Sequence, residues 1–501
     1  MHTKSGLVDS VSVVPVSTRA SMPESGITLS ATFKTRMNTV ESRDALWDQT
    51  ELRALGVTGE IDELVVTFAP RGKTPHPFAL FGIGELEIGQ EPALGSIRDA
   101  VGSAVRRLKM FVHITIAIPA ESEEMLAAIA EGALMGAYER SAKSANDEIG
   151  TIKVSIRTSV PHKRAKLVLQ RAQVVARAVA TTRWLVNLPP NQLTPDDFSR
   201  IVVETARELD LESSVISSEE LRNRGYGGLT AVGKGSINAP SLVTVTYRPK
   251  DPVSHVALVG KGVTFDSGGI SLKPAKSMSE MKSDMAGAAT AFQAVVAAAL
   301  LNIPVTTSAW LPLAENMPSG SACRPGDVIE IYGGTTVEIL DTDAEGRLVL
   351  ADSLAAASET RPGYIVDIAT LTGAQIVALG YRTVGVMGDP VVTSKLLVAA
   401  SIASESLWEM PINGELRQEL KSRVADMTNL TSKAGAMMGA AQFLSEFIGN
   451  QLDGSRIPWA HLDIAGPAFN SFEPHGSTPT GGTGVMVRTL IEFLDKMAKD
   501  A

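Results

Sequence analysis

The chain has 501 residues, of which 46 are basic and 55 are acidic, giving a net charge of −9. This length predicts two or more domains, and the acidic balance argues against a protein built mainly to neutralise phosphates. The single cysteine, Cys323, excludes an intrachain disulfide and a cysteine-rich zinc site. We interpret Cys323 as a buried small side chain and expect a cytoplasmic protein.

Residues 1–165 are expected to form a small α/β domain. The first twenty residues contain charges and only a short apolar stretch, too weak for the core of a signal peptide. The expected elements are strands at 64–68, 110–118 and 152–156 and a helix at 122–138. In the second strand Val112, Ile114, Ile116 and Ile118 share one face. His113 lies on the other face, so we interpret it as structural.

A helical pattern over 166–190 is the expected linker to a second domain at 191–501, and Pro189 and Pro190 end it. Beyond it, helices alternate with short apolar strands such as 242–247, which is typical of a mostly parallel sheet covered on both faces. The expected fold is therefore α/β, with a small N-terminal domain, a linker helix and a larger C-terminal domain. In such sheets, sites gather at the carboxyl ends of strands.

Three further stretches have plain structural interpretations. Residues 228–235 nearly match a phosphate-binding loop, but Gly235 stands where a hydroxyl must contact magnesium, so we expect a turn with close backbone approach. The apolar run 285–301 contains Gln293, which favours a buried core helix over a membrane span. Gly333 and Gly334, between two apolar stretches, predict a tight hairpin.

Residues 341–348 read Asp-Thr-Asp-Ala-Glu-Gly-Arg-Leu, between a strand-like stretch and an apolar-faced helix. On a strand, positions two apart face the same way, so Asp343 and Glu345 can aim at one point, and Gly346 lets the backbone turn. Arg347 offers a rigid fork of donors to a planar anion. The plainer alternative is that the acids cap the helix and Arg347 pairs with one of them.

A second polar cluster follows a buried-looking strand at 255–259. It contains Lys261, Asp266 and Lys273 among glycines, with Asp284 shortly after. With Asp343 and Glu345 these acids offer only oxygen ligands, which favour hard or borderline divalent ions. Crowded carboxylates repel one another, and two metal ions that share bridging carboxylates would offset that repulsion.

Together these stretches resemble the leucyl aminopeptidase family, whose hallmark is Asn-Thr-Asp-Ala-Glu-Gly-Arg-Leu. The chain has seven of the eight residues, with Asp341 in place of the first, which adds a negative charge near the site. Further matching stretches are found at 187–191, 369–374 and 459–467, so the resemblance runs from about residue 180 to the end. It implies an aminopeptidase that releases N-terminal Leu, Met and other apolar residues from peptides.

The resemblance also implies two divalent metal ions per chain, Mn²⁺ or Zn²⁺. The side chains that match the family's ligands are Lys261, Asp266, Asp284, Asp343 and Glu345. Asp266 and Glu345 would bridge the ions, and a water between them would have a pKa of about 7 and attack the first peptide carbonyl. Lys273 would stabilise the oxyanion, and Arg347 would hold a bicarbonate that relays the proton.

Substrate contacts and assembly are implied in the same way. The residues that match the family's substrate site are Met281, Thr370, Leu371, Gly373, Ala465 and Ala468. The small Ala468 leaves room for larger first residues. The family forms hexamers, so a homohexamer is expected, with no membrane partner.

The alternatives to an aminopeptidase are a DNA-binding protein and a dinuclear phosphoesterase. Some bacterial members of the family also bind DNA, but the acidic balance disfavours a nucleic-acid partner here. A dinuclear phosphoesterase would usually include histidine ligands, and the sequence places none near the acids.

Overall fold

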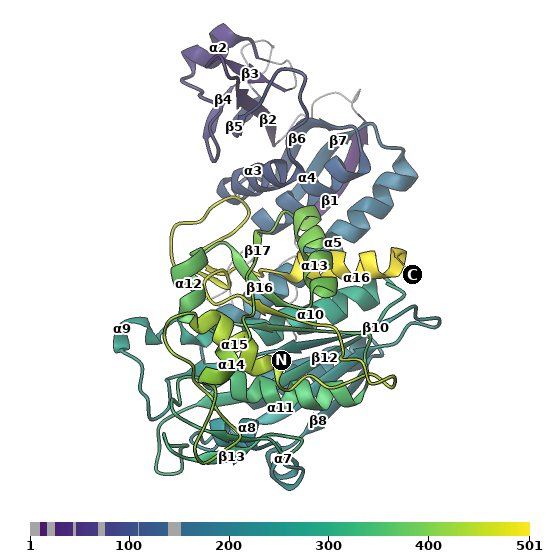
Figure 1. The fold of residues 1–501 in the computed structure, drawn as a ribbon. Coiled ribbons are helices and arrows are strands. Elements are labelled where there is room, and N and C mark those ends of the chain that lie inside the picture. The colour runs from purple at the N-terminus through teal and green to yellow at the C-terminus, as the bar shows by residue number, and fades with distance from the viewer. Residues whose placement is uncertain are drawn as a thin grey trace. The chain divides into compact units, whose positions relative to one another are not determined.

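This computed structural model describes residues 11–17, 26–43, 47–68, 76–108, 110–138 and 152–500. The first ten residues, on which the interpretation of the N-terminus partly rests, lie outside this part of the chain. The described residues separate into two compact units (Figure 1). One takes in the chain up to Ala180 together with Phe472–Thr480, and the other takes in Thr181–Ser471 and the C-terminal stretch from Gly481.

The first unit is built on a seven-stranded sheet with the order β1-β7-β6-β2-β5-β4, and β3 pairs with β2. Its strands are β1 (Val11–Ser17), β2 (Ile27–Lys34), β3 (Val40–Ser42), β4 (Leu64–Phe68), β5 (Pro77–Glu85), β6 (His113–Ala120) and β7 (Ile152–Thr158). Its helices are α2 (Gln49–Ala54), α3 (Leu94–Arg107) and α4 (Glu123–Gly136). The strands from β1 to β5 along the sheet are parallel, whereas β3 and β4 are antiparallel to their neighbours.

The expected strands at 64–68 and 152–156 and the expected helix are confirmed, whereas the strand expected at 110–118 begins only at His113. His113 Nε2 lies 3.0 Å from Ser155 Oγ on the neighbouring strand, which agrees with a structural role. Val112, however, precedes β6 and is 70% exposed, so its expected place on a strand face with Ile114 was wrong. Ile114, Ile116 and Ile118 are buried on one face of β6, and Thr115 and Ala117 are buried on the other.

The second unit is built on a nine-stranded sheet with the order β17-β16-β19-β15-β10-β12-β9-β8, and β11 pairs with β12. These strands are β8 (Glu212–Ile216), β9 (Ser241–Tyr247), β10 (His255–Gly260), β11 (Gly262–Asp266), β12 (Thr306–Asn316), β15 (Tyr364–Ala369), β16 (Val384–Gly388), β17 (Leu407–Glu409) and β19 (Trp459–Asp463). The strands β19, β15, β10, β12 and β11 are parallel. Their carboxyl ends therefore meet at one edge of the sheet.

Helices α10 (Ala286–Leu300) and α11 (Gly346–Glu359) cover the two faces of this sheet (Figure 1). Alternate residues of β10, Ala257 and Val259, pack in one apolar cluster with Leu350 and Leu354 of α11. The remaining helices are α5 (His162–Asn187), α6 (Pro195–Glu208), α7 (Ser218–Asn223), α8 (Gly227–Gly233), α9 (Ala275–Met278), α12 (Gly373–Leu379), α13 (Pro390–Ala403), α14 (Leu416–Glu419), α15 (Ala436–Ser445) and α16 (Val487–Lys499). The expected α/β fold with a mostly parallel central sheet is confirmed.

The structure describes the three stretches that were interpreted as a hairpin, a glycine-rich turn and a buried core helix. The predicted hairpin joins β13 (Val328–Glu330) to β14 (Thr336–Glu338), and both of its glycines have positive φ. The glycine-rich stretch forms helix α8 as far as Gly233, and the expected turn is confined to Lys234 and Gly235. The expected close approach is present, because a Cβ on Gly228 would lie 2.3 Å from Leu348 O. Among the described residues, only the helical segment Met281–Leu300 has the length and apolar composition of a membrane span, and 89% of its most apolar window is buried in the protein.

Candidate functional site

The acidic cluster forms where several segments meet at the carboxyl edge of the central sheet. Asp266 is the last residue of β11, and Asp284 lies between a short 3-10 helix, η1 (Met281–Ser283), and α10. Asp343 and Glu345 belong to the turn that precedes α11. One carboxylate oxygen from each of Asp266, Asp343 and Glu345 lies within 4.8 Å of the other two. Three of the expected ligands thus converge on one point.

One lysine joins the remaining acid, Asp284, to this group, and a second lysine pairs with two acids of the group. Lys261 directly follows β10, and its Nζ lies 2.8 Å from Asp284 Oδ2 and 2.8 Å from Glu345 Oε1. Lys273 Nζ lies 2.8 Å from Asp266 Oδ2 and 2.5 Å from an oxygen of Asp343. These ion pairs form two sets, and the spacing of the Asp266, Asp343 and Glu345 oxygens, within 4.8 Å, brings both sets into one charged cluster.

Burial makes these carboxylates costly to ionise. It raises the pKa of Glu345 to about 8 and that of Asp284 to about 6, and the neighbouring Asp266 adds to both shifts. Burial alone would lower the pKa of Lys261, but the surrounding acids outweigh it and raise that pKa. Glu345 Oε2 is buried without a hydrogen-bond partner among the described residues. Such a set of buried, mutually repelling oxygens suits divalent cations.

The acids converge through a turn and not through strand alternation. Strand β14 ends at Glu338 and belongs to a small sheet with β13 and β18 (Met427–Thr428), so residues 341–345 do not extend a strand of the central sheet. The Asp341 carboxylate accepts a hydrogen bond from the Asp343 N–H at 2.9 Å. The Thr342 hydroxyl donates to the carbonyl of Gly268 at 2.7 Å. These two bonds shape the corner, and the expected strand geometry was wrong.

The plainer interpretation of this corner is also wrong. Glu345 occupies the N-cap position of α11 but makes no side-chain capping bond. The Arg347 guanidinium donates from Nη1 to the carbonyl of Asn429 at 2.8 Å, and no ion pair joins it to an acid within the described part of the chain. Burial lowers the pKa of Arg347 to about 10, so it remains a cation at neutral pH. Its Nε is buried without a partner among the described residues, and can donate to an anion.

Two asparagines support the acids and were missed in the sequence. Asn316, the last residue of β12, donates from Nδ2 to Asp266 Oδ1 at 2.8 Å and to the carbonyl of Thr342 at 3.0 Å. Asn429 donates to the carbonyl of Asp341 at 2.7 Å and accepts from the N–H of Leu340. The position of Asn316 at a strand's carboxyl end could have signalled its role. Asn429 lies in a loop far along the chain, and no local pattern marks it.

Most of the expected substrate residues lie on loops at the same edge. Thr370 and Leu371 follow β15, Gly373 begins α12, and Ala465 follows β19; each keeps some exposed surface. Thr370 donates its hydroxyl to Asp284 Oδ1 at 2.7 Å. Met281 lies in η1, three residues before Asp284, and is partly exposed. Ala468 is buried and only 2% exposed.

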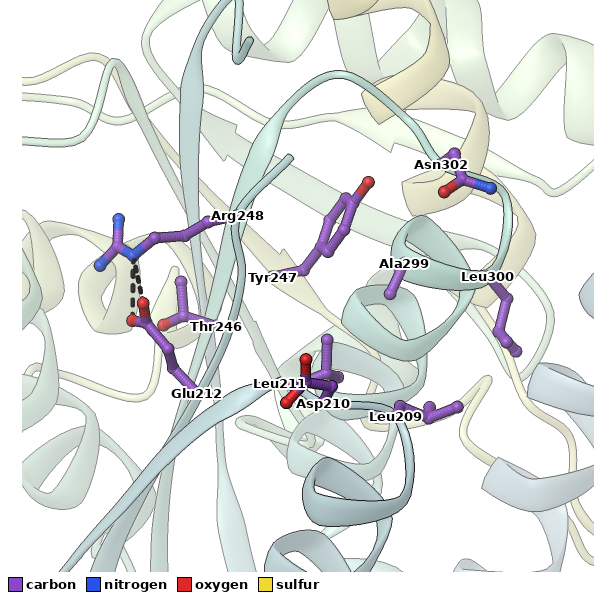
Figure 2. Close-up of a pocket in the computed structure, with 10 residues that line it drawn as sticks. All are labelled: Leu209, Asp210, Leu211, Glu212, Thr246, Tyr247, Arg248, Ala299, Leu300 and Asn302. Atoms are coloured by element: carbon purple, nitrogen blue, oxygen red, sulfur yellow. Dashed lines mark hydrogen bonds and ion pairs between the residues drawn. The ribbon is translucent and has the colours of Figure 1, made fainter. Parts of the chain in front are cut away.

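A separate surface pocket lies away from these residues (Figure 2). Its volume is about 330 Å³, and its wall includes Tyr247 and Arg248 at the end of β9, with Arg248 bonded to Glu212 at 2.9 Å. Tyr247 pairs with Thr307 near the start of β12, whereas Asn316 ends that strand beside Asp266. The pocket thus lies at the opposite edge of the sheet from the acids, and we assign the chemistry to the acidic cluster.

Comparisons with known proteins agree with this assignment. Residues 180–491 match the cytosol aminopeptidase family, catalytic domain. The chain is 47% identical to a probable cytosol aminopeptidase of Micrococcus luteus, over 89% of each chain. It is also 47% identical to one of Clavibacter michiganensis subsp. michiganensis, over 89% of this chain and 90% of the relative. The solved structure of the bottromycin maturation enzyme BotP in complex with Mn is similar, with a TM-score of 0.82 and 35% identity over 94% of this chain and 99% of BotP. The chain therefore belongs to the cytosol aminopeptidase family, which makes it a metallo-aminopeptidase.

Proposed function

We propose that this enzyme is a leucyl aminopeptidase that uses two metal ions to release N-terminal Leu, Met and other apolar residues from peptides. The observation that carries the proposal is the charged cluster in which Lys261 and Lys273 pair with four carboxylates at one edge of the sheet. The partly exposed loops at Thr370 and Ala465, at the same edge, offer a place for a peptide.

The proposed ligands of the two ions are Lys261, Asp266, Asp284, Asp343 and Glu345. When bound, Mn²⁺ or Zn²⁺ would supply Lewis acidity and a nucleophilic water at neutral pH. The buried oxygens support this proposal because their mutual repulsion is relieved by cations. The similar BotP structure was solved in complex with Mn, which makes Mn²⁺ the first ion to test.

The proposed catalytic groups are Lys273 and Arg347. Lys273 keeps its charge because Asp266 and the other acids raise its pKa against the opposing effect of burial, so it can stabilise a developing oxyanion. Arg347 has a buried donor, Nε, that has no partner among the described residues and can donate to a bicarbonate. The carbonyl of Leu371 would receive the peptide, and Met281, Thr370, Gly373, Ala465 and Ala468 would surround the first side chain.

We further propose a cytoplasmic homohexamer with an N-terminal domain at 1–165, a linker helix at 166–190 and a catalytic domain at 191–501. These proposals rest on the resemblance to the family and on the sequence pattern.

The proposed reaction class can be tested by comparing substrates. The Mn²⁺-treated protein should hydrolyse leucine p-nitroanilide and leave p-nitrophenyl phosphate intact. N-acetylation of the leucine should abolish hydrolysis, because an aminopeptidase requires a free α-amine. Hydrolysis of the phosphate ester, or equal rates on the acetylated and free substrates, would contradict the proposal.

A further inference from the structure

Asp463 is a fully buried carboxylate that the proposed reaction does not use. It is the last residue of β19 and lies opposite Ala369, the last residue of the parallel strand β15. Asp463 Oδ1 accepts hydrogen bonds from the backbone N–H groups of Leu371 and Ala465, each at 3.2 Å. Its Oδ2 accepts from the hydroxyl of Thr372 at 2.7 Å. One carboxylate thus joins the two loops that follow these neighbouring strands.

The peptide group between Thr370 and Leu371 is held at both of its ends. Its carbonyl accepts a hydrogen bond from Lys261 Nζ at 2.9 Å, and its N–H donates to Asp463. In a planar trans peptide these two groups point in opposite directions, so Lys261 and Asp463 restrain one rigid unit from opposite sides. Thr370 adds a third restraint through its bond to Asp284.

Three hydrogen-bond donors face the Asp463 carboxyl group. Burial raises the pKa of this carboxyl, and His461, Thr372 and the two backbone donors oppose that rise without cancelling it. His461 is itself held by Asp367, whose oxygen lies 2.5 Å from Nδ1. A neutral amide at position 463 would keep one acceptor oxygen and would place an NH₂ group against donors. The contacts of Asp463 therefore depend on a carboxylate.

We propose that Asp463 is a positioning residue that fixes the 370–372 segment against the ligand side of the site. This role rests on the proposed function, because it is the carbonyl of Leu371, next along this segment, that would receive the peptide. With the peptide group clamped between Lys261 and Asp463, the direction of that carbonyl is set before substrate arrives. Pre-set geometry of this kind lowers the cost of binding.

Thr372 provides the sharpest test because its hydroxyl can be removed without changing the volume greatly. Thr372→Val deletes the donor to Asp463 together with the N-cap acceptor for the Gln375 N–H of α12, and Thr372→Ser retains both. For leucine p-nitroanilide we expect Thr372→Val to lower kcat/KM about tenfold, mainly through KM, and Thr372→Ser to stay within about twofold of the wild type. The Mn²⁺ content of both variants should equal that of the wild type, because no proposed ligand changes.

Asp463→Asn tests the carboxylate itself, with Asp352→Asn as a matched control. Asp352 is equally buried and accepts backbone hydrogen bonds from Leu229 at 2.7 Å and Tyr332 at 2.8 Å, neither of which is a proposed ligand or substrate residue. We expect Asp463→Asn to lower kcat/KM by about a hundredfold, and Asp352→Asn to lower only the urea midpoint.

The results of these experiments distinguish failure of the positioning role from failure of the proposed function. A wild-type enzyme that is inactive on peptide substrates would overturn the proposed function and this role with it. An active wild type with unchanged KM and kcat in Thr372→Val would overturn only the role of Asp463. The Thr372 pair decides the question even where Asp463→Asn fails to fold.

Discussion

The aliphatic end of Lys261 lies directly against the backbone of Gly346. A Cβ on this glycine would lie 2.6 Å from Lys261 Cε and 2.7 Å from Nζ. The glycine was expected to permit a turn, but it is the approach of the lysine that requires it. Lys261 cannot simply move aside, because it is held by Asp284 and Glu345.

Gly346→Ala should therefore displace Lys261 from its partners. Forcing a methyl group into this packed site should cost about 1–3 kcal/mol of stability. We expect lower Mn²⁺ content and lower activity, measured by mass spectrometry and by leucine p-nitroanilide hydrolysis. Gly414→Ala is a suitable control because a Cβ there meets no atom within 4 Å. Full metal content and activity in Gly346→Ala would contradict this account of the glycine.

Replacing Lys261 and replacing Lys273 should impair the enzyme in different ways. Lys261→Ala should lose tight binding at one metal position and recover partly in excess Mn²⁺, because Lys261 is a proposed ligand. Lys273→Ala should keep both ions and lose mainly kcat, because its charge acts on the transition state. The measurement is metal content beside kinetics for each variant. Two tightly bound ions in Lys261→Ala, or one in Lys273→Ala, would show that these roles are wrongly assigned.

Asp341→Asn should remove the negative charge at residue 341 while the turn before α11 is retained. An asparagine side chain can still accept the hydrogen bond from the Asp343 N–H, so the turn should persist. Removing a partly exposed negative charge near the ligands should weaken Mn²⁺ binding about two- to threefold. Asp341→Ala, which loses the bond as well, should be less stable than Asp341→Asn. Calorimetric titration with Mn²⁺ measures the effect, and tighter binding in Asp341→Asn would oppose it.

The stability of the metal-free protein should depend on pH in part through Glu345. Its pKa is raised from 4.5 to about 8, mainly by burial, so between these values the folded state binds more protons than the unfolded state. The free energy of unfolding should therefore fall as pH rises from about 4.5 to 8. Urea unfolding in a chelator at pH 5.5 and 8 measures this loss. In Glu345→Gln the free energy of unfolding should depend less on pH. An equally strong dependence in that variant would show that other groups cause it.

The sequence predicted the parts of the site that local patterns encode. The acids at 341–348, the strand before Lys261 and the helix α11 are each marked by neighbours along the chain. Contacts between residues far apart in the sequence are not indicated by any local pattern. Asn429 reaches the corner from a distant loop, and Phe472–Thr480 joins the first unit through contacts such as Ser477 with Asp99 at 3.0 Å. The strand geometry expected at the acids failed because Asp341 and Thr342 bond into a turn.

The most direct test of the central claim is to measure hydrolytic activity as a function of the number of metal ions bound per chain. Leucine p-nitroanilide hydrolysis should vanish after exhaustive chelation, return as Mn²⁺ or Zn²⁺ is added, and reach its full value at about two ions per chain. Asp343→Ala should not recover under the same addition, because it removes one of the three converging oxygens. Undiminished hydrolysis by a fully chelated enzyme would contradict the proposal that metal ions held by these acids perform the reaction.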